Sequence, residues 1–89
     1  YGTIRMHQER DYPARVYATA LDNPDFGALA RAYGLHGETV QRTADFAPAF
    51  ERAVASGNAA LLELRIDPEA ITTRTSLTAI REQALKSGR

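Results

Sequence analysis

Residues 37–66 read GETVQRTADFAPAFERAVASGNAALLELRI, and this stretch decides the fold. Its first part, Gly37–Gln41, is a candidate for a short strand. Its last part, Ala60–Ile66, places leucine or isoleucine at 62, 64 and 66, in the alternation typical of a strand. The part between them predicts a helix that Thr43 caps and that Ser56-Gly57-Asn58 ends. The buried stripe of that helix is expected at Phe46, Phe50, Ala53 and Val54.

Two short strands around one helix predict a βαβ unit, in which the strands run parallel. A two-stranded sheet is marginally stable alone, and parallel sheets are normally covered on both faces. We therefore expect an α/β fold, a partial three-layer doubly wound parallel sheet with a βαβ unit and flanking helices. Residues 1–89 are expected to form a single partial domain.

Helices are also predicted on both sides of this unit. The first spans Tyr1–Arg10 and ends before Pro13, because proline disfavours helix in the preceding residue. Residues 13–22 are expected to form a loop. A second helix is predicted over residues 24–33, with Asn23 as its cap, Pro24 as its first residue and Gly34 as its C-terminal cap.

A last helix is predicted to begin at Thr75 or Ser76, after an irregular segment over residues 69–74. Its expected contacts are Leu77, Ile80 and Leu85.

Composition excludes several classes of function. Eleven basic side chains balance eleven acidic ones, which argues against broad electrostatic binding to nucleic acid or an anionic membrane. The absence of cysteine excludes disulfides and thiolate chemistry. The polar segment Tyr1–Arg10 does not resemble a signal peptide, so a cytoplasmic location is expected. The chain starts with Tyr1 rather than Met, so we expect either that residues were removed or that this is an excised fragment.

Three stretches in order resemble the thiamine diphosphate-dependent enzymes. Residues 1–9, YGTIRMHQE, resemble the helix that follows the paired asparagines of that family. Residues 23–34 resemble its N-P-D-F-x-x-L-A-x-A-Y-G stretch, and residues 60–68 resemble its final strand. The resemblance runs to about Ile80 and is closest to acetolactate synthase and benzoylformate decarboxylase-like proteins. It identifies the chain as the C-terminal part of a diphosphate-binding domain.

This resemblance implies a parent enzyme that uses thiamine diphosphate and Mg²⁺ on 2-oxo acids, as a carboligase or decarboxylase. In the family, a Gly-Asp-Gly motif and two asparagines hold the metal, and the active site lies between domains of different subunits. The implied partners are the rest of the chain and a second subunit, in a homodimer or homotetramer. The present sequence contains neither Gly-Asp-Gly nor Asn-Asn, so it is expected to be inactive alone.

The resemblance also implies which residues approach the cofactor. Tyr1 and Gly2 would bring backbone N–H groups to the diphosphate, and glycine allows a close approach. Thr3 and Ile4 would line the reactive side. Ile4 is equally well explained as a core contact. No catalytic residue and no metal ligand is assigned to the chain itself, and no cofactor is expected to bind it alone.

Other polar residues have weaker functional interpretations. A solvated side chain is the better explanation of His7 than a substrate contact, and His36 is expected on the surface or in a loop. Residues 11–22 correspond to a segment that can order over the cofactor in the family, where glycine often replaces Ala14. An ordinary connection is the alternative. Glu63 and Arg65 share one strand face, and an ion pair or a domain interface would explain them.

The remaining large apolar residues are interpreted as core. They are Phe26, Tyr33, Phe46, Phe50, Leu62, Leu64 and Ile66.

A free-standing α/β interaction module is the alternative function, and it would bind a partner through the apolar surface of an incomplete sheet. A small hydrolase is disfavoured because no Gly-x-Ser-x-Gly motif is present. In either case we expect self-association of the isolated chain, since a sheet edge needs cover.

Overall fold

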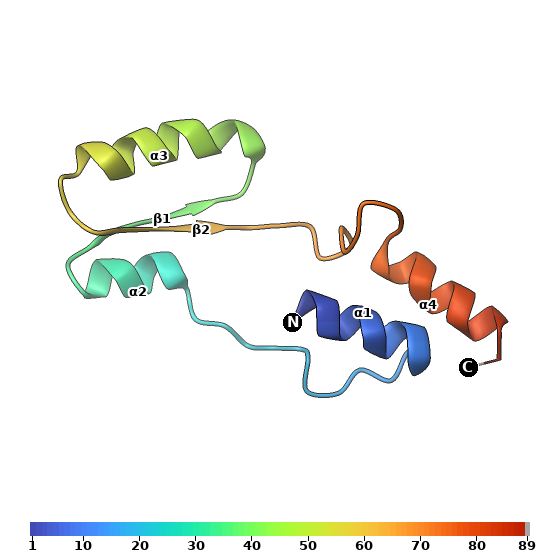
Figure 1. Cartoon of the computed structure of the whole chain (residues 1–89). Helices are drawn as coiled ribbons and strands as arrows, with labels where there is room; N and C mark the ends of the chain where they lie inside the picture. The colour runs from blue at the N-terminus through green and yellow to red at the C-terminus, as the bar shows by residue number, and fades with distance from the viewer. Residues whose placement is uncertain (89) are drawn as a thin grey trace. The chain divides into compact units, whose positions relative to one another are not determined.

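The computed structural model describes residues 1–88 (Figure 1). The elements in chain order are α1 (Gly2–Asp11), α2 (Phe26–Ala32), β1 (His36–Val40), the 3₁₀ turn η1 (Thr43–Asp45), α3 (Phe46–Ala55), β2 (Ala60–Leu64) and α4 (Leu77–Lys86). They form two compact units. The βαβ unit comprises residues 22–66, and the helical unit comprises residues 1–21 with the residues from 67 onward.

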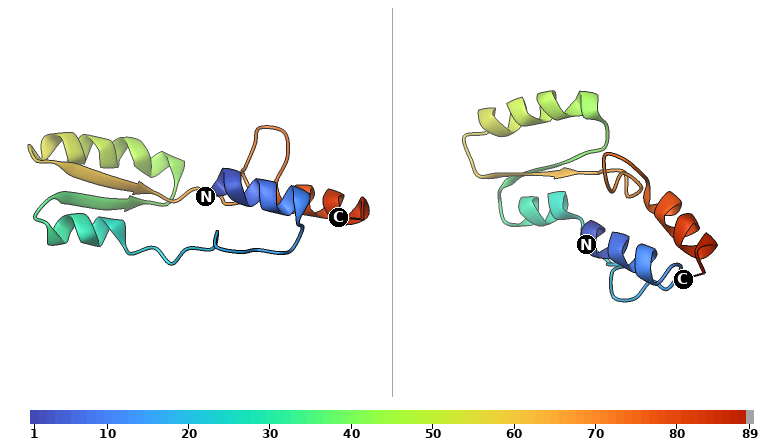
Figure 2. Two further views of the ribbon diagram at one scale, coloured as in Figure 1. Left: turned by 60° about the horizontal axis from the view of Figure 1, so that its bottom comes forward. Right: turned by 45° about the vertical axis from the view of Figure 1, so that its right-hand side comes forward.

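The βαβ unit confirms the predicted α/β fold. Strands β1 and β2 pair in parallel, in a register that runs from His36 opposite Ala60 to Val40 opposite Leu64. Helices α2 and α3 lie on opposite faces of the two strands, which makes three layers (Figures 1 and 2). Both predicted strands are present, with β1 one residue earlier than expected and β2 ending at Leu64.

Close backbone approach holds α2 against β1. A methyl group at Gly37 would overlap the carbonyl oxygen of Gly27 and would lie 2.9 Å from the Cβ of Ala30. The guanidinium of Arg31 donates to the carbonyl oxygen of Gly37 at 2.7 Å. Small residues at this crossing let the helix and the strand meet backbone to backbone. Gly34, just after the helix, has a φ of +76°, which confirms its predicted capping role.

Two of the predicted helix caps are wrong. Asp25, not Asn23, caps α2, because its carboxylate accepts the N–H of Ala28 at 2.9 Å. Pro24 therefore precedes the helix. Thr43 begins a 3₁₀ turn, and α3 starts at Phe46 with Asp45 as its N-cap, two residues later than predicted. Arg42 and Asp45 bridge this turn through a pair of hydrogen bonds of 3.0 and 3.3 Å.

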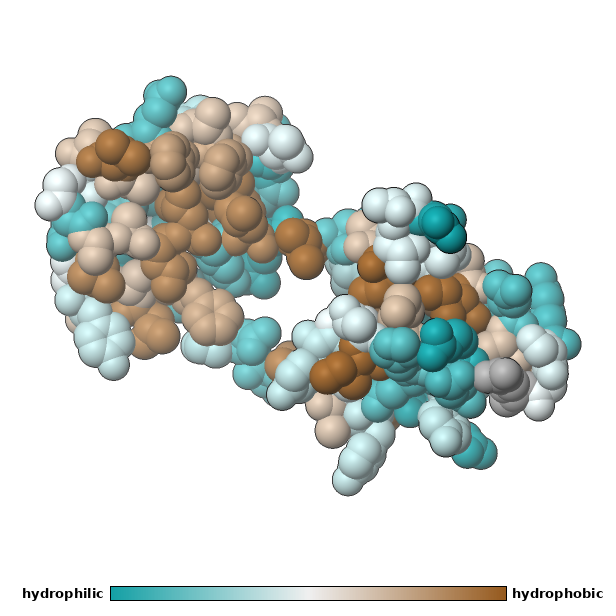
Figure 3. Space-filling view, in the orientation of Figure 1, coloured by the Kyte–Doolittle hydropathy of each residue, from teal (hydrophilic) through white to brown (hydrophobic). Residues whose placement is uncertain are grey.

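Most of the large residues predicted as core are exposed. Phe50 is 53% exposed, Tyr33 74% and Ile66 83%, and Phe46, Val54 and Leu64 are exposed as well. The core of the βαβ unit is formed by small side chains, namely Ala30, Val40, Ala49 and Ala53, and among these the burial of Ala53 was predicted. Phe26 and Leu62 are half-buried. Two strands are too narrow to cover both helices, so the outer apolar side chains gather on the surface (Figure 3).

The helical unit packs α1 against α4. Both helices are confirmed, and Ser76 caps α4 by accepting the N–H of Ala79 at 3.2 Å. Leu77 and Ala84 are buried in this unit, whereas Leu85 is exposed, contrary to expectation. Residues 69–74 are irregular, as predicted. No helix within residues 1–88 is both long enough and apolar enough to cross a membrane.

Candidate functional site

The first turn of α1 is open. Helix geometry leaves the N–H groups of Gly2, Thr3 and Ile4 without intrahelical acceptors. Tyr1 is the N-cap, and within the described residues its side chain makes no capping bond. The first turn carries no acidic residue. Free N–H groups at the positive end of a helix dipole suit an anion, so this turn is the candidate site.

Gly2 lies close to one side chain of the same helical unit. A Cβ on Gly2 would lie 2.9 Å from the Cδ1 of Ile71, which belongs to the same helical unit. The sequence interpretation attributed this glycine to ligand approach, and Ile71 does not require it, because its Cδ1 is the far end of a flexible side chain that can move aside. Ile4 is exposed, so it is not the core contact that was the alternative to a cofactor-facing role.

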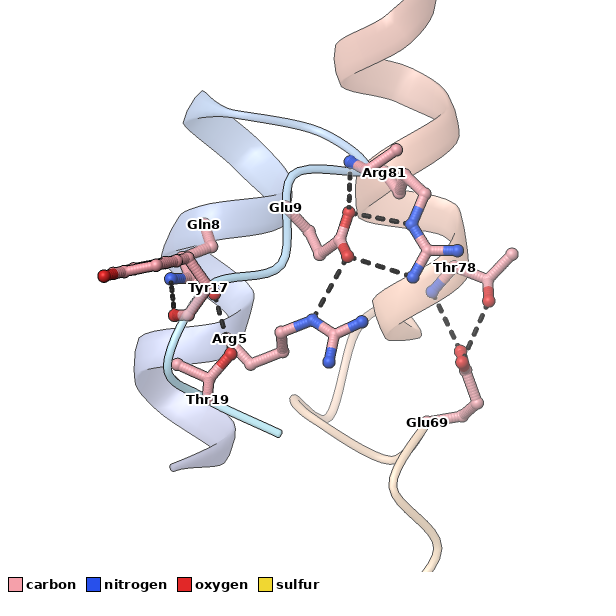
Figure 4. A network of polar contacts seen from close by, with 9 residues as sticks. Arg5, Gln8, Glu9, Tyr17, Thr19, Glu69, Thr78 and Arg81 are labelled. Carbon is pink, nitrogen blue, oxygen red and sulfur yellow. Dashed lines mark hydrogen bonds and ion pairs between the residues drawn. The ribbon is translucent and has the colours of Figure 1, made fainter. Parts of the chain in front are cut away.

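The central feature of the helical unit is Glu9, a charged side chain that is only 1% exposed. Arg81 donates to its carboxylate from Nε at 2.7 Å and from Nη2 at 3.0 Å. Arg5 donates from Nε at 3.2 Å, and the backbone N–H of Ala14 donates at 3.0 Å (Figure 4). The hydrogen bonds from Arg81 lower the pKa of Glu9 to about 2, against the opposing effect of burial.

The residue before Glu9 holds the loop that follows α1. Gln8 donates to the carbonyl oxygen of Tyr17 at 2.7 Å and accepts from the hydroxyl of Thr19 at 2.8 Å (Figure 4). Ala14 and Ala18 in this loop have φ values of +59° and +60°. The predicted loop is confirmed, and its backbone adopts the left-handed conformation at Ala14, the position where the resemblance pointed to glycine.

A second acidic residue fixes the start of α4. Glu69 accepts the backbone N–H of Thr78 at 2.8 Å and its hydroxyl at 2.9 Å (Figure 4). Together with the Ser76 cap, this satisfies amide groups that the first turn of α4 would otherwise leave free. The position of Arg81, one turn further along, is thereby defined.

The two histidines are placed differently from one another. His7 is exposed, and its Nδ1 lies 2.7 Å from Nη2 of Arg10. His36 is half-buried in β1, not in a loop, and its Nε2 lies 2.7 Å from a carboxylate oxygen of Glu38. Within residues 1–88, no group of three or more acidic or histidine side chains could hold a metal ion.

The pair predicted on β2 is present. The guanidinium of Arg65 lies 3.6 Å from the carboxylate of Glu63. Glu63 also accepts from the hydroxyl of Thr39 at 3.1 Å across the two strands.

A shallow cavity of about 300 Å³ lies at the carboxyl ends of β1 and β2. Val40, Phe46 and Leu64 form its apolar side, and Arg42, Thr43 and Arg65 are among its polar residues. Ligands of parallel α/β sheets bind beyond this end of the strands. Arg42 and Arg65 are both engaged with carboxylates of the same unit, so the cavity offers no unpaired arginine from its own lining.

Glu9 and Arg81 are the residues that the sequence interpretation missed. The spacing of Arg5 and Glu9, four apart on a helix, was an available signal for an ion pair. Arg81 lies 72 positions away from Glu9, and no local pattern could have paired them.

Comparisons with known proteins agree with this arrangement. Residues 1–64 match the family described as thiamine pyrophosphate enzyme, C-terminal TPP binding domain. The chain is 36% identical to the acetolactate synthase isozyme 2 large subunit of Escherichia coli over 67 residues, which are 74% of this chain and 12% of that protein. It is 34% identical over 76 residues to a probable acetolactate synthase of Mycobacterium bovis, covering 85% of this chain and 14% of that protein.

The acetolactate synthase large subunit IlvG of Mycobacterium tuberculosis matches to the same extent as the M. bovis protein. The chain thus spans only about one eighth of the length of these relatives. No solved structure gives a significant match. The family match covers both strands, three of the four α-helices and the open turn of α1, and the chain therefore belongs to the C-terminal TPP-binding domain family of the thiamine pyrophosphate enzymes.

Proposed function

We propose that this chain is the C-terminal part of the diphosphate-binding domain of a cytoplasmic, acetolactate synthase-like enzyme that acts on 2-oxo acids with thiamine diphosphate and Mg²⁺. The observation that carries the proposal is the family match over residues 1–64, which includes the open first turn of α1. In this proposal both compact units are parts of one larger domain.

The residues of α1 fit a diphosphate. Three amide groups without acceptors and the positive end of a ten-residue helix favour phosphate oxygens, and no carboxylate in the first turn opposes them. Tyr1, Gly2, Thr3 and Ile4 would hold or flank this group. When bound, the cofactor supplies the carbanion chemistry of carbon–carbon bond cleavage and formation, and the protein supplies position and electrostatics. The exposed side chain of Ile4 would exclude water beside it.

The magnesium ligands would come from other parts of the parent enzyme. Mg²⁺ requires oxygen ligands in near-octahedral geometry, and the described residues contain no cluster of that kind. The sequence also lacks the Gly-Asp-Gly and Asn-Asn motifs. We therefore expect the 89-residue chain to be inactive and to bind no cofactor alone.

The partners would be the rest of the polypeptide and a second subunit, in a homodimer or homotetramer. The exposed apolar residues of the βαβ unit support this, since Phe46 and Phe50 stack at 5.9 Å between ring centroids on a surface rich in apolar side chains (Figure 3). Isolated, the chain should self-associate. Sedimentation at increasing concentration should show assembly, and Phe50→Gln should reduce it more than the control Glu51→Gln on the same helix.

Calorimetry tests the main proposal. Thiamine diphosphate should bind the longer polypeptide that carries this segment only when Mg²⁺ is present, and the same protein should release carbon dioxide from pyruvate or a related 2-oxo acid. The 89-residue chain should give no heat of binding under the same conditions. The proposal would be contradicted by a longer polypeptide that gives no heat of binding with thiamine diphosphate at millimolar concentration.

A free-standing interaction module is the second candidate, and the exposure of Phe50 and Ile66 favours it. It differs in one respect that can be measured. An interaction module would function at a mass of 9.8 kDa, whereas the enzyme segment would be active only within a longer protein. The intact mass of the protein extracted from its natural source separates the two.

A further inference from the structure

The family match ends at residue 64, but residues after that point also pack against α1. Helix α4 packs against α1, and its Arg81 makes two of the four hydrogen bonds to Glu9. The segment from residue 67 onward therefore contributes directly to the helix whose first turn is the candidate diphosphate site. This contribution comes from residues beyond the stretch that matches the family.

The contact is specific in its geometry. Arg81 uses Nε and Nη2 on the two different oxygens of Glu9, which fixes the rotation of the carboxylate as well as its position. The remaining two donors, Arg5 and the N–H of Ala14, come from α1 and from the loop after it. One buried carboxylate thus joins three segments of the helical unit, and Glu9 is 1% exposed.

A helix transmits such a constraint along its axis. Glu9 lies seven residues after Gly2, which corresponds to about 10 Å, or two turns, of a rigid helix. A rotation of α1 about its axis at Glu9 would rotate the N–H groups of the first turn by the same angle. Near the other end of α1, Gly2 lies close to the side chain of Ile71, which belongs to the same C-terminal segment.

Resting on the proposed function, we propose that Arg81 is a positioning residue for cofactor binding: through Glu9 it fixes the orientation in which α1 presents its first turn to the diphosphate. Arg81 touches neither cofactor nor substrate. It acts by defining the direction of N–H groups two turns away, and positional accuracy of this kind has large effects on binding.

The test uses the longer enzyme with thiamine diphosphate as the probe and Mg²⁺ in excess. Arg81→Met removes the charge at similar length, and Arg81→Lys keeps the charge but cannot span both oxygens. The dissociation constant for thiamine diphosphate, measured by calorimetry, and the activation constant should both rise about tenfold in Arg81→Met and by less in Arg81→Lys. The kcat at saturating cofactor, per folded molecule, should remain that of the wild type.

Arg52→Met is the matched control. Arg52 makes a similar two-nitrogen contact with Glu38, at 3.1 and 2.8 Å, in the βαβ unit. Its loss should leave the activation constant unchanged. A loss of folded protein alone would lower the apparent kcat of Arg81→Met and leave its activation constant at the wild-type value.

The outcomes separate this inference from the proposed function. If the wild-type enzyme binds thiamine diphosphate and Arg81→Met has an unchanged activation constant, the positioning role is overturned and the proposed function stands. If the wild-type enzyme does not bind thiamine diphosphate at all, both are overturned. A rise in the activation constant that Arg52→Met reproduces equally would also overturn the positioning role.

Discussion

The contacts that stabilise the helical unit internally differ in kind from those that stabilise the βαβ unit. In the helical unit, a buried carboxylate receives four hydrogen bonds from Arg81, Arg5 and Ala14. In the βαβ unit, the buried residues are mainly alanines, and β1 meets α2 through the paired glycines at 27 and 37. Ion pairs in that second unit, such as Arg52 with Glu38, lie near the surface.

The difference concerns what each unit can tolerate. A charge network specifies orientation, because donors and acceptors must align, and it is sensitive to the loss of one partner. Backbone contact between small residues is sensitive to any added volume. The unit that holds the candidate diphosphate site is the one built on directional contacts, and the unit with an exposed apolar surface is the one built on close approach.

The largest effect is expected from adding volume in the βαβ unit. Gly37→Ala should lower the free energy of unfolding by about 3–4 kcal/mol, because the added methyl group meets a backbone carbonyl that no side-chain rotation can move. Urea unfolding of the 89-residue chain measures it. Gly27→Ala is the control, since its methyl group would meet only side-chain atoms at 3.2 Å or more, and α2 would gain helix propensity. Equal effects of the two substitutions would contradict this account of the crossing.

The next largest effect is expected from lowering the pH, which should destabilise the helical unit selectively. The folded pKa of Glu9 is about 2 and its ordinary value is 4.5, so the stabilisation is complete above pH 4.5 and is lost as the pH falls towards 2. The loss should approach about 3 kcal/mol. Amide hydrogen exchange should show α1 and α4 losing protection in this window, and Glu9→Gln should remove the dependence.

The carboxylates of the βαβ unit provide the comparison. Hydrogen bonds from Arg52 and His36 lower the pKa of Glu38, and a hydrogen bond from Arg42 lowers that of Asp45. Both groups are solvated, so acid should affect this unit less. If β1 and β2 lose protection at a higher pH than α1 does, the proposed difference between the two units is contradicted.

Removing one arginine from each unit should lower the free energy of unfolding by different amounts. Arg81→Met should lower the free energy of unfolding by about 2 kcal/mol, since it leaves a buried carboxylate with fewer donors. Arg52→Met should cost clearly less, because Arg52 is exposed. Chemical unfolding of both variants at pH 7 makes the measurement, and a similar cost for the two would show that burial of Glu9 does not set the difference.

The smallest expected effect is an increase in stability. Ala14→Gly should stabilise the helical unit by about 0.5–1 kcal/mol, because a residue with a side chain is strained at a φ of +59°. Ala20→Gly in the same loop should destabilise, since Ala20 is not among the residues with positive φ. Thermal unfolding of the two variants decides the sign, and a loss of stability in Ala14→Gly would contradict the strain.

Periodic and local features of the fold were predictable from the sequence. The alternation in residues 60–66 and the turn signals around Gly34 and Gly57 located both strands and the ends of α2 and α3. The prediction that Phe46 and Phe50 are buried was wrong, because helical spacing identifies an apolar face without showing what covers it. A sheet of two strands leaves that face uncovered.

Cap identity and the buried network were beyond sequence patterns. Asn23 and Asp25 are both good capping residues, and only the backbone conformation at Asp25 decides between them. Arg81 reaches Glu9 because α1 and α4 pack together, which depends on tertiary structure. The candidate site itself was predictable from the resemblance of residues 1–9, but the proximity of Gly2 to Ile71 was not.

The most direct test of the central claim places a negative charge at the first turn of α1. Thr3→Glu should stabilise the helix itself by about 0.3–1 kcal/mol through the helix dipole, and Thr3→Gln is its neutral control of the same shape. In the longer enzyme, the dissociation constant for thiamine diphosphate should rise about tenfold or more in Thr3→Glu relative to Thr3→Gln, because the new carboxylate repels the diphosphate. Equal dissociation constants for the two variants would contradict a diphosphate at this turn.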